Sequence, residues 1–149
     1  MEMETEIADF LGKVTLFANL NERNLKRLSR ACTVRSFDTG DFVVRQGDEG
    51  IGLFVITSGK VKVQKTTDDG REIEIATHGS GEFVGEFSVL DGAKRTASVV
   101  TLEPTECIVL ASWDFNAVMK AHPEIALEIL PVVVKRFRET NEKLLAVSE

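Results

Sequence analysis

The amino-acid sequence predicts a mainly β domain: an antiparallel β-roll of the jelly-roll type, with one N-terminal helical region and C-terminal helices. Short β-rich runs separated by glycine turns occupy residues 33–111. Apolar residues at helical spacing precede and follow that stretch. Many short strands at regular spacing are typical of sandwiches and barrels, and a chain of 149 residues can form one such domain with a sizeable core.

The first part of the chain, residues 1–32, is predicted to be helical from about residue 3 to residue 31. Asn21 is a favourable N-cap residue, since its side chain can accept a hydrogen bond from a free backbone N–H. Leu20, Leu25 and Leu28 recur at helical spacing around it. We also expect Leu16 and Phe17 to pack inward.

The β-roll is predicted over residues 33–111 because strand-like runs alternate there with turn signals. Val61 and Val63 share one face of their run, as do Ile73 and Ile75, with lysine or glutamate between them. Turns are predicted at Gly40, Gly47, Gly59, Gly70 and Gly79–Gly81. The predicted strand runs are TVRSF, DFVVRQ, GLFVIT, KVKVQK, REIEIAT, RTASVVTL and ECIVLA.

The last part of the chain, residues 112–149, returns to helical periodicity. Ser112 or Asp114 is the predicted cap of one helix, and Pro123 suits the first turn of another. Pro131 is expected to break or kink the helix that follows, which should run to about Val147. With no low-complexity stretch or long linker, the sequence predicts a single domain over residues 1–149.

Composition excludes several classes of function. The net charge of −6 and the pI of about 5.1 argue against a nucleic-acid-binding surface, which is normally basic. Cys32 and Cys107 are far apart and form no CxxC motif, so we expect buried reduced thiols rather than a metal site. Because the chain shows neither a signal peptide nor an apolar run of about 20 residues, a soluble cytoplasmic protein without membrane contact is predicted.

The stretch GEFSVLDGAKRTAS, residues 85–98, carries the pattern of a binding site. Gly85 permits a sharp turn and a close approach to a ligand, and residues 86–90 can form a helical turn whose free N–H groups suit a phosphate. Arg95, at the start of the next predicted strand, can donate paired hydrogen bonds to the same phosphate. The Glu86 carboxylate can accept from a sugar hydroxyl. The alternative, from spacing alone, is a surface ion pair.

The segment FVGEFSVLDGAKRTASV resembles the phosphate-binding cassette of cyclic-nucleotide-binding domains, here residues 83–99. That family includes catabolite-activator-type regulators, kinase regulatory subunits and cyclic-nucleotide-gated channels. Phe87, Ser88 and Lys94 depart mildly from its pattern. The resemblance covers nearly the whole chain, including the upstream glycines and the segment KRFRETNEKL. The residues that match at family spacing are Gly85, Glu86, Arg95, Ala97, Ser98 and Val99.

The resemblance implies a role for each cassette residue. Arg95 would hold the cyclic phosphate together with backbone groups of Gly85, Phe87 and Ser88, and Glu86 would hold the ribose 2′-hydroxyl. Thr96 either adds a contact that admits cGMP or is an ordinary β-branched strand residue.

In similar members a polar pair on the last helix faces the purine. Thr140 and Asn141 are the corresponding residues, unless they are merely solvated. Leu130, Val134, Phe137, Asn141 and Leu144 also follow a heptad spacing, which suits a parallel helix pair and hence a homodimer. The alternative is a single amphipathic helix docked on its own roll. We expect this helix to close over the nucleotide as a lid.

The function predicted from the sequence is a stand-alone receptor for cAMP, with cGMP as a second ligand, that signals to an unknown protein effector. The given sequence shows no DNA-binding, kinase or channel module after residue 149, although it can also be a piece of a longer protein. No cofactor or metal is expected. A nucleotide-blind interaction module, or a receptor for another nucleotide such as a cyclic dinucleotide, is the alternative. A cupin-type enzyme is disfavoured because His78 and His122 lie in different segments.

Overall fold

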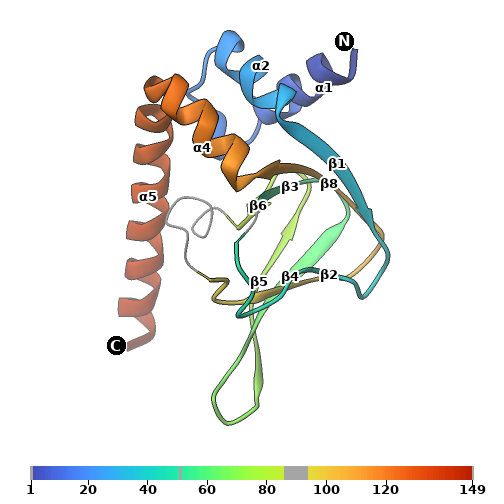
Figure 1. Cartoon of the computed structure of the whole chain (residues 1–149). Coiled ribbons are helices and arrows are strands. Elements are labelled where there is room, and N and C mark those ends of the chain that lie inside the picture. The colour runs from blue at the N-terminus through green and yellow to red at the C-terminus, as the bar shows by residue number, and fades with distance from the viewer. Residues whose placement is uncertain (1, 51, 86–93, 149) are drawn as a thin grey trace.

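The protein is described by a computed structural model that covers residues 2–50, 52–85 and 94–148. Helices lie at one end of a roll of strands and along one of its sides (Figure 1). Their bounds are α1 (Glu2–Leu11), η1 (Thr15–Phe17), α2 (Glu22–Arg30), α4 (Ser112–Ala121) and α5 (Pro123–Ser148).

Two four-stranded antiparallel sheets form the roll within the described residues. The strand orders are β1–β8–β3–β6 and β2–β7–β4–β5. This arrangement confirms the predicted fold class of an antiparallel β-roll with flanking helices. The strands are β1 (Cys32–Phe37), β2 (Phe42–Val44), β3 (Gly52–Ser58), β4 (Lys60–Thr66), β5 (Glu72–Gly79), β6 (Phe83–Val84), β7 (Ser98–Thr101) and β8 (Thr105–Ala111).

The apolar core has two parts. One lies between the helices and the first sheet, where Phe17 meets Phe115 edge-on with ring centroids 6.2 Å apart. The other fills the inside of the roll, where Phe37 and Phe54 make a similar contact at 6.4 Å. Burial of these large side chains is the main source of stability for such a fold.

The N-terminal helical stretch is less continuous than predicted. It divides into α1, the short η1 and α2, because the chain turns at Gly12 and again before Asn21. The predicted cap is confirmed, since Asn21 Oδ1 accepts a hydrogen bond from the Asn24 N–H at 2.9 Å. Leu16 and Phe17 are buried as expected.

The predicted cap of the first C-terminal helix is wrong, and the second helix has no break at Pro131. Helix α4 starts at Ser112 after the extended residue Ala111, and neither Ser112 nor Asp114 caps it; the Ser112 hydroxyl instead donates to the Gly50 carbonyl at 3.2 Å. Helix α5 begins at Pro123 as expected but continues through Pro131. Pro131 and Leu127 are both exposed, so water can satisfy the carbonyl that a proline at this position leaves unpaired.

The β4–β5 hairpin also differs from the simple alternating pattern. Ile73 and Ile75 are 47% and 56% exposed, whereas Val61 on the paired strand is buried. Strand β5 is the edge of its sheet, and a register shift between Val63 and Gln64 interrupts the pairing. The hairpin extends beyond the body of the roll, which leaves its end without a covering layer (Figure 1).

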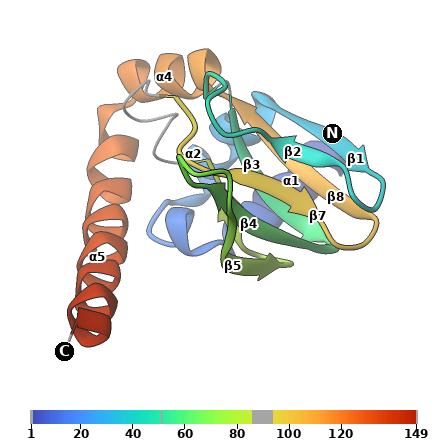
Figure 2. The ribbon, with the colours of Figure 1, turned by 90° about the horizontal axis from the view of Figure 1, so that it is seen from below.

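Among the described residues, the buried side chains of α5 lie in its first part. Ile125 and Ile129 are fully buried in the core that contains Leu16 and Phe17. From two perpendicular views the C-terminal half of the helix stands away from both sheets (Figures 1 and 2). The helix therefore has a fixed base, around the buried residues Ile125 and Ile129, and a far end, after Arg136, whose described side chains are exposed.

Candidate functional site

Arg95 lies between the β2–β3 connection and the start of β7, and its backbone is fixed by that connection. Its N–H donates to the Asp48 carbonyl at 2.8 Å, and its own carbonyl accepts from the Gly47 N–H at 2.9 Å. Lys94 forms an isolated antiparallel bridge with Glu49. The prediction that Arg95 opens a strand is wrong, because β7 begins at Ser98.

The guanidinium of Arg95 points into the roll. Arg95 is 5% exposed and is the one buried residue with a charged side chain among the described residues. Its Nη1 donates to the Gly85 carbonyl at 3.0 Å, and its Nη2 donates to the Gly52 carbonyl. A buried cation is costly unless polar groups compensate it, and an anion compensates it more strongly than carbonyl dipoles do.

Gly85 is required by the geometry of this contact. Its φ is +93°, a conformation that residues with a side chain rarely adopt. A Cβ placed here would lie 2.9 Å from the Gly52 carbonyl oxygen and 3.1 Å from the Arg95 Cζ. The backbone after β6 can therefore approach the guanidinium only because residue 85 has no side chain.

The structure thus brings together two residues predicted for the site, Gly85 and Arg95. Thr96, which is exposed, and Ala97, which is half-buried, follow Arg95 directly. The predicted contributions of Glu86, Phe87 and Ser88 lie outside the described residues.

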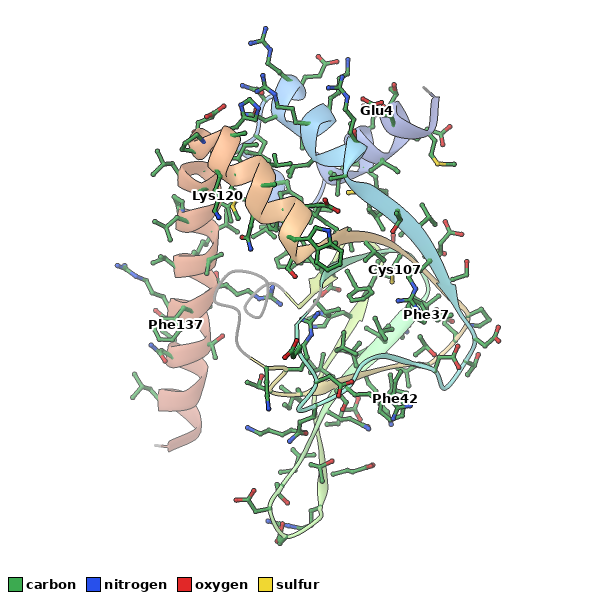
Figure 3. All side chains as sticks on the ribbon, viewed as in Figure 1. Glu4, Phe37, Phe42, Cys107, Lys120 and Phe137 are labelled. Carbon is green, nitrogen blue, oxygen red and sulfur yellow. The ribbon has the colours of Figure 1, made fainter. Side chains whose placement is uncertain are left out.

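The predicted purine contacts are not assembled at Arg95 in this structure. Thr140 and Asn141 are exposed on α5, and the Thr140 hydroxyl donates to the Arg136 carbonyl of its own helix at 3.0 Å. Figure 3 shows Phe137 on the same helix, to one side of the roll that holds Phe37 and Cys107.

Two features of the site were missed by sequence reasoning. The Gly52 carbonyl is a direct partner of Arg95, and the sequence reasoning gave Gly52 no role at the site. Arg136 lies over the Phe83 ring, with its Cζ 4.6 Å from the ring centroid, which places α5 beside the strand leading to Gly85. A periodicity analysis cannot find such a contact, because it joins segments far apart in sequence.

The cysteines show no sign of a reactive site. Both are free thiols; Cys107 is buried and Cys32 is half-buried. Burial, with a smaller effect of the Asp114 charge, raises the pKa of Cys32 to about 12. Burial is also the main cause that raises the pKa of Cys107 to about 11, so neither thiolate is populated near neutral pH.

Metal-binding and membrane-spanning features were also searched for over residues 2–50, 52–85 and 94–148. This part of the chain contains no group of three or more histidine, cysteine, aspartate or glutamate residues placed to hold a metal ion. Within the same ranges, none of the helices has the length and apolar character needed to cross a bilayer.

The protein is thus a β-roll domain with a buried arginine beside a glycine turn. Comparison with known proteins identifies the family. The family model described as "Cyclic nucleotide-binding domain" matches residues 34–122, and the chain belongs to that family. Such a domain is a ligand-binding regulatory fold rather than a catalytic one.

Similar proteins come from different organisms. The chain is 36% identical over 110 residues to the cyclic AMP receptor protein of Thermus thermophilus, covering 74% of this chain and 51% of that protein. It is 36% identical over 105 residues to the cGMP-dependent protein kinase egl-4 of Caenorhabditis briggsae, covering 70% of this chain and 14% of the kinase. The chain thus spans about half of the first relative and a small part of the second.

A solved structure is similar over almost its full length. The N-terminal domain of a transcriptional regulator from Streptomyces coelicolor A3(2) superposes with a TM-score of 0.77 at 34% identity. The superposition covers 90% of this chain and 96% of that domain.

Proposed function

We propose that this chain is a receptor for cAMP and that Arg95 holds the cyclic phosphate. One observation carries the proposal: Arg95, which is 5% exposed, donates through its guanidinium to the carbonyl of Gly85, a glycine of the predicted cassette. Arginine donates paired, charge-assisted hydrogen bonds to phosphate oxygens, which suits a singly charged cyclic phosphodiester.

Binding would add a phosphate to the backbone partners of Arg95. The Gly52 and Gly85 carbonyls now accept from Arg95, and a guanidinium has five N–H donors, enough to serve a phosphate as well. By the resemblance, backbone groups of Phe87 and Ser88 would complete the phosphate contacts, and Glu86 would accept from the ribose 2′-hydroxyl. Ligand preference between cAMP and cGMP would depend on Thr96 and on the purine contacts.

The same proposal gives α5 the role of the responding element. Thr140 and Asn141 are exposed at present, so reaching the purine requires the far end of α5 to move toward the roll. A nucleotide that binds this closed arrangement more tightly than the open one shifts the population toward it. A protein effector would then distinguish the two positions of the helix.

We further propose that α5 pairs with α5 of a second copy. Val134 and Phe137 are 42% and 59% exposed, and Leu130 is 57% exposed, although all three are apolar. The face that docks on the protein's own roll uses other residues, Ile125 and Ile129. The exposed stripe is therefore separate from the docked face and is free to pack in a heptad seam.

The receptor proposal is tested by calorimetric titration of protein freed of bound nucleotide by unfolding and refolding. The ligands are cAMP, cGMP and 5′-AMP, the last with an open, doubly charged phosphate. Saturable binding of cAMP that exceeds that of 5′-AMP is expected. A folded sample that binds neither cyclic nucleotide would contradict the proposal and favour a nucleotide-blind interaction module.

The dimer proposal is tested by sedimentation equilibrium of the protein and of Phe137→Glu. A charge in the seam should convert a dimer into a monomer, since an unpaired charge is costly in an apolar contact. Leu102→Glu, which places the same charge at an exposed apolar position elsewhere, should remain a dimer. A protein that is monomeric at all concentrations would contradict the pairing.

A further inference from the structure

The boundary between the fixed base of α5 and its far end falls at Arg136. The helix is anchored by the buried residues Ile125 and Ile129, and Arg136, two turns later, is half-buried. Every side chain described after Arg136, at positions 137–142 and 145, is exposed. Arg136 therefore lies where docking of the helix on the roll comes to an end.

Arg136 makes contacts with the roll at this boundary. Its guanidinium lies over the ring of Phe83, a buried residue of β6, at 4.6 Å from the centroid. A cation at this distance from an aromatic face is attracted by the ring quadrupole.

The neighbouring Glu82 carboxylate adds a charge contact. Burial acts to raise the pKa of Glu82, but hydrogen bonds with His78 and the Gly79 N–H, together with the charges of His78 and Arg136, outweigh it and lower the pKa. Glu82 is therefore ionised near neutral pH and attracts the guanidinium. Hydrogen bonds with the His78 ring and the Gly79 N–H hold the Glu82 carboxylate in place beside the end of β5.

The contact reaches the predicted binding site through the backbone. Phe83 is two residues before Gly85, whose carbonyl accepts from Arg95 at 3.0 Å. A displacement of Phe83 is thus transmitted along a short extended segment to the residue that holds the phosphate-binding arginine. Arg136 contacts Phe83 in β6, and Arg95 contacts Gly85 directly after that strand, so both arginines act on residues 83–85.

A cavity lies beside the contact between Arg136 and Phe83, so the position of α5 there depends on Arg136. A cavity of about 270 Å³ lies between α5, η1 and the β5–β6 turn. It is lined by Thr15, Glu82, Phe83, Val132, Lys135 and Arg136, among others. Because a cavity rather than close packing flanks the helix here, few other contacts can replace the one made by Arg136.

We infer that Arg136 is a positioning residue that clamps α5 onto β6. The clamp sets the position from which the far end of the helix moves. The role of that movement in signalling rests on the proposed function. Loss of the clamp releases the helix beyond its buried base and loosens the segment 83–85. The contact between Arg136 and Phe83 can be tested in protein to which no nucleotide has been added.

The test is amide hydrogen exchange, followed by mass spectrometry, on the nucleotide-free protein and its variants. Arg136→Met keeps the length of the side chain and removes the cation. Exchange should become about two- to fivefold faster over residues 132–148 and over 83–85, the range for loss of one partly exposed cation–π contact. Exchange in α1 and α2 should not change.

Matched variants separate the clamp from a general loss of stability. Lys135→Met removes the adjacent cation, which lines the same cavity but is exposed, and should exchange like the unmodified protein. Arg136→Lys keeps the charge near Glu82 and should recover part of the protection. Equal exchange in Arg136→Met and Lys135→Met would overturn the inference. A failure of nucleotide binding would bear only on the proposed function, because no nucleotide is present here.

Discussion

Replacing Arg95 with alanine tests the proposed phosphate contact. The guanidinium is buried and donates to the Gly52 and Gly85 carbonyls, so its removal affects both the nucleotide and the fold. For the nucleotide, losing two charge-assisted hydrogen bonds of about 1.5–3 kcal/mol each weakens cAMP binding by about a hundredfold to ten-thousandfold. For the fold, the Gly52 and Gly85 carbonyls lose their hydrogen-bond donor. This lowers the free energy of unfolding by about 1–3 kcal/mol for each carbonyl that water does not reach.

The assay compares cAMP titrations with thermal unfolding of each variant. Arg95→Lys keeps a positive charge but not the paired geometry and should lose less affinity than Arg95→Ala. Arg71→Ala is the matched control, since it makes the same charge change where the side chain is 73% exposed and pairs with Asp69 at 2.9 Å. If a folded Arg95→Ala protein binds cAMP as tightly as Arg71→Ala does, the assignment of the phosphate contact is refuted.

Three further predictions concern the cassette and the thiols. Gly85→Ala should weaken cAMP binding about tenfold or more, because a strained φ of +93° is combined with a clash at the Gly52 carbonyl; unchanged affinity by titration would contradict this. Glu86→Gln should reduce discrimination between cAMP and its 2′-deoxy analogue, measured as the ratio of the two affinities, and an unchanged ratio would exclude the ribose contact. Cys32 and Cys107, whose pKa values are raised to about 12 and about 11, should react slowly with a thiol reagent at neutral pH and rapidly once the protein unfolds; fast reaction of the native protein would count against burial.

The sequence was informative wherever a local rule decides the structure. Asn21 caps α2 because a short polar side chain can reach its own N–H groups, and Pro123 begins α5 because its missing N–H is not needed there. The antiparallel roll followed from short strands with regular turns. Gly85 and Arg95 were each predicted for the site, from residue type and from the resemblance to the cassette, and they are in contact.

The sequence was less informative where distant segments decide the outcome. Pro131 interrupts an isolated helix, yet here the apolar face of α5 stays docked through Ile129 and the helix continues. Ile73 and Ile75 alternate like residues with a buried face, but the hairpin that carries them extends beyond the roll. The contact of Arg136 with Phe83 depends on the placement of α5, which no local pattern encodes.

The most direct test of the central claim is a crystal structure of the protein with cAMP bound. The account predicts the cyclic phosphate within hydrogen-bonding distance of the Arg95 guanidinium and close to Gly85, inside the roll. Thr140 or Asn141 should then lie nearer to the purine than their present exposed positions allow. A nucleotide bound elsewhere, or a phosphate held without Arg95, would contradict the account.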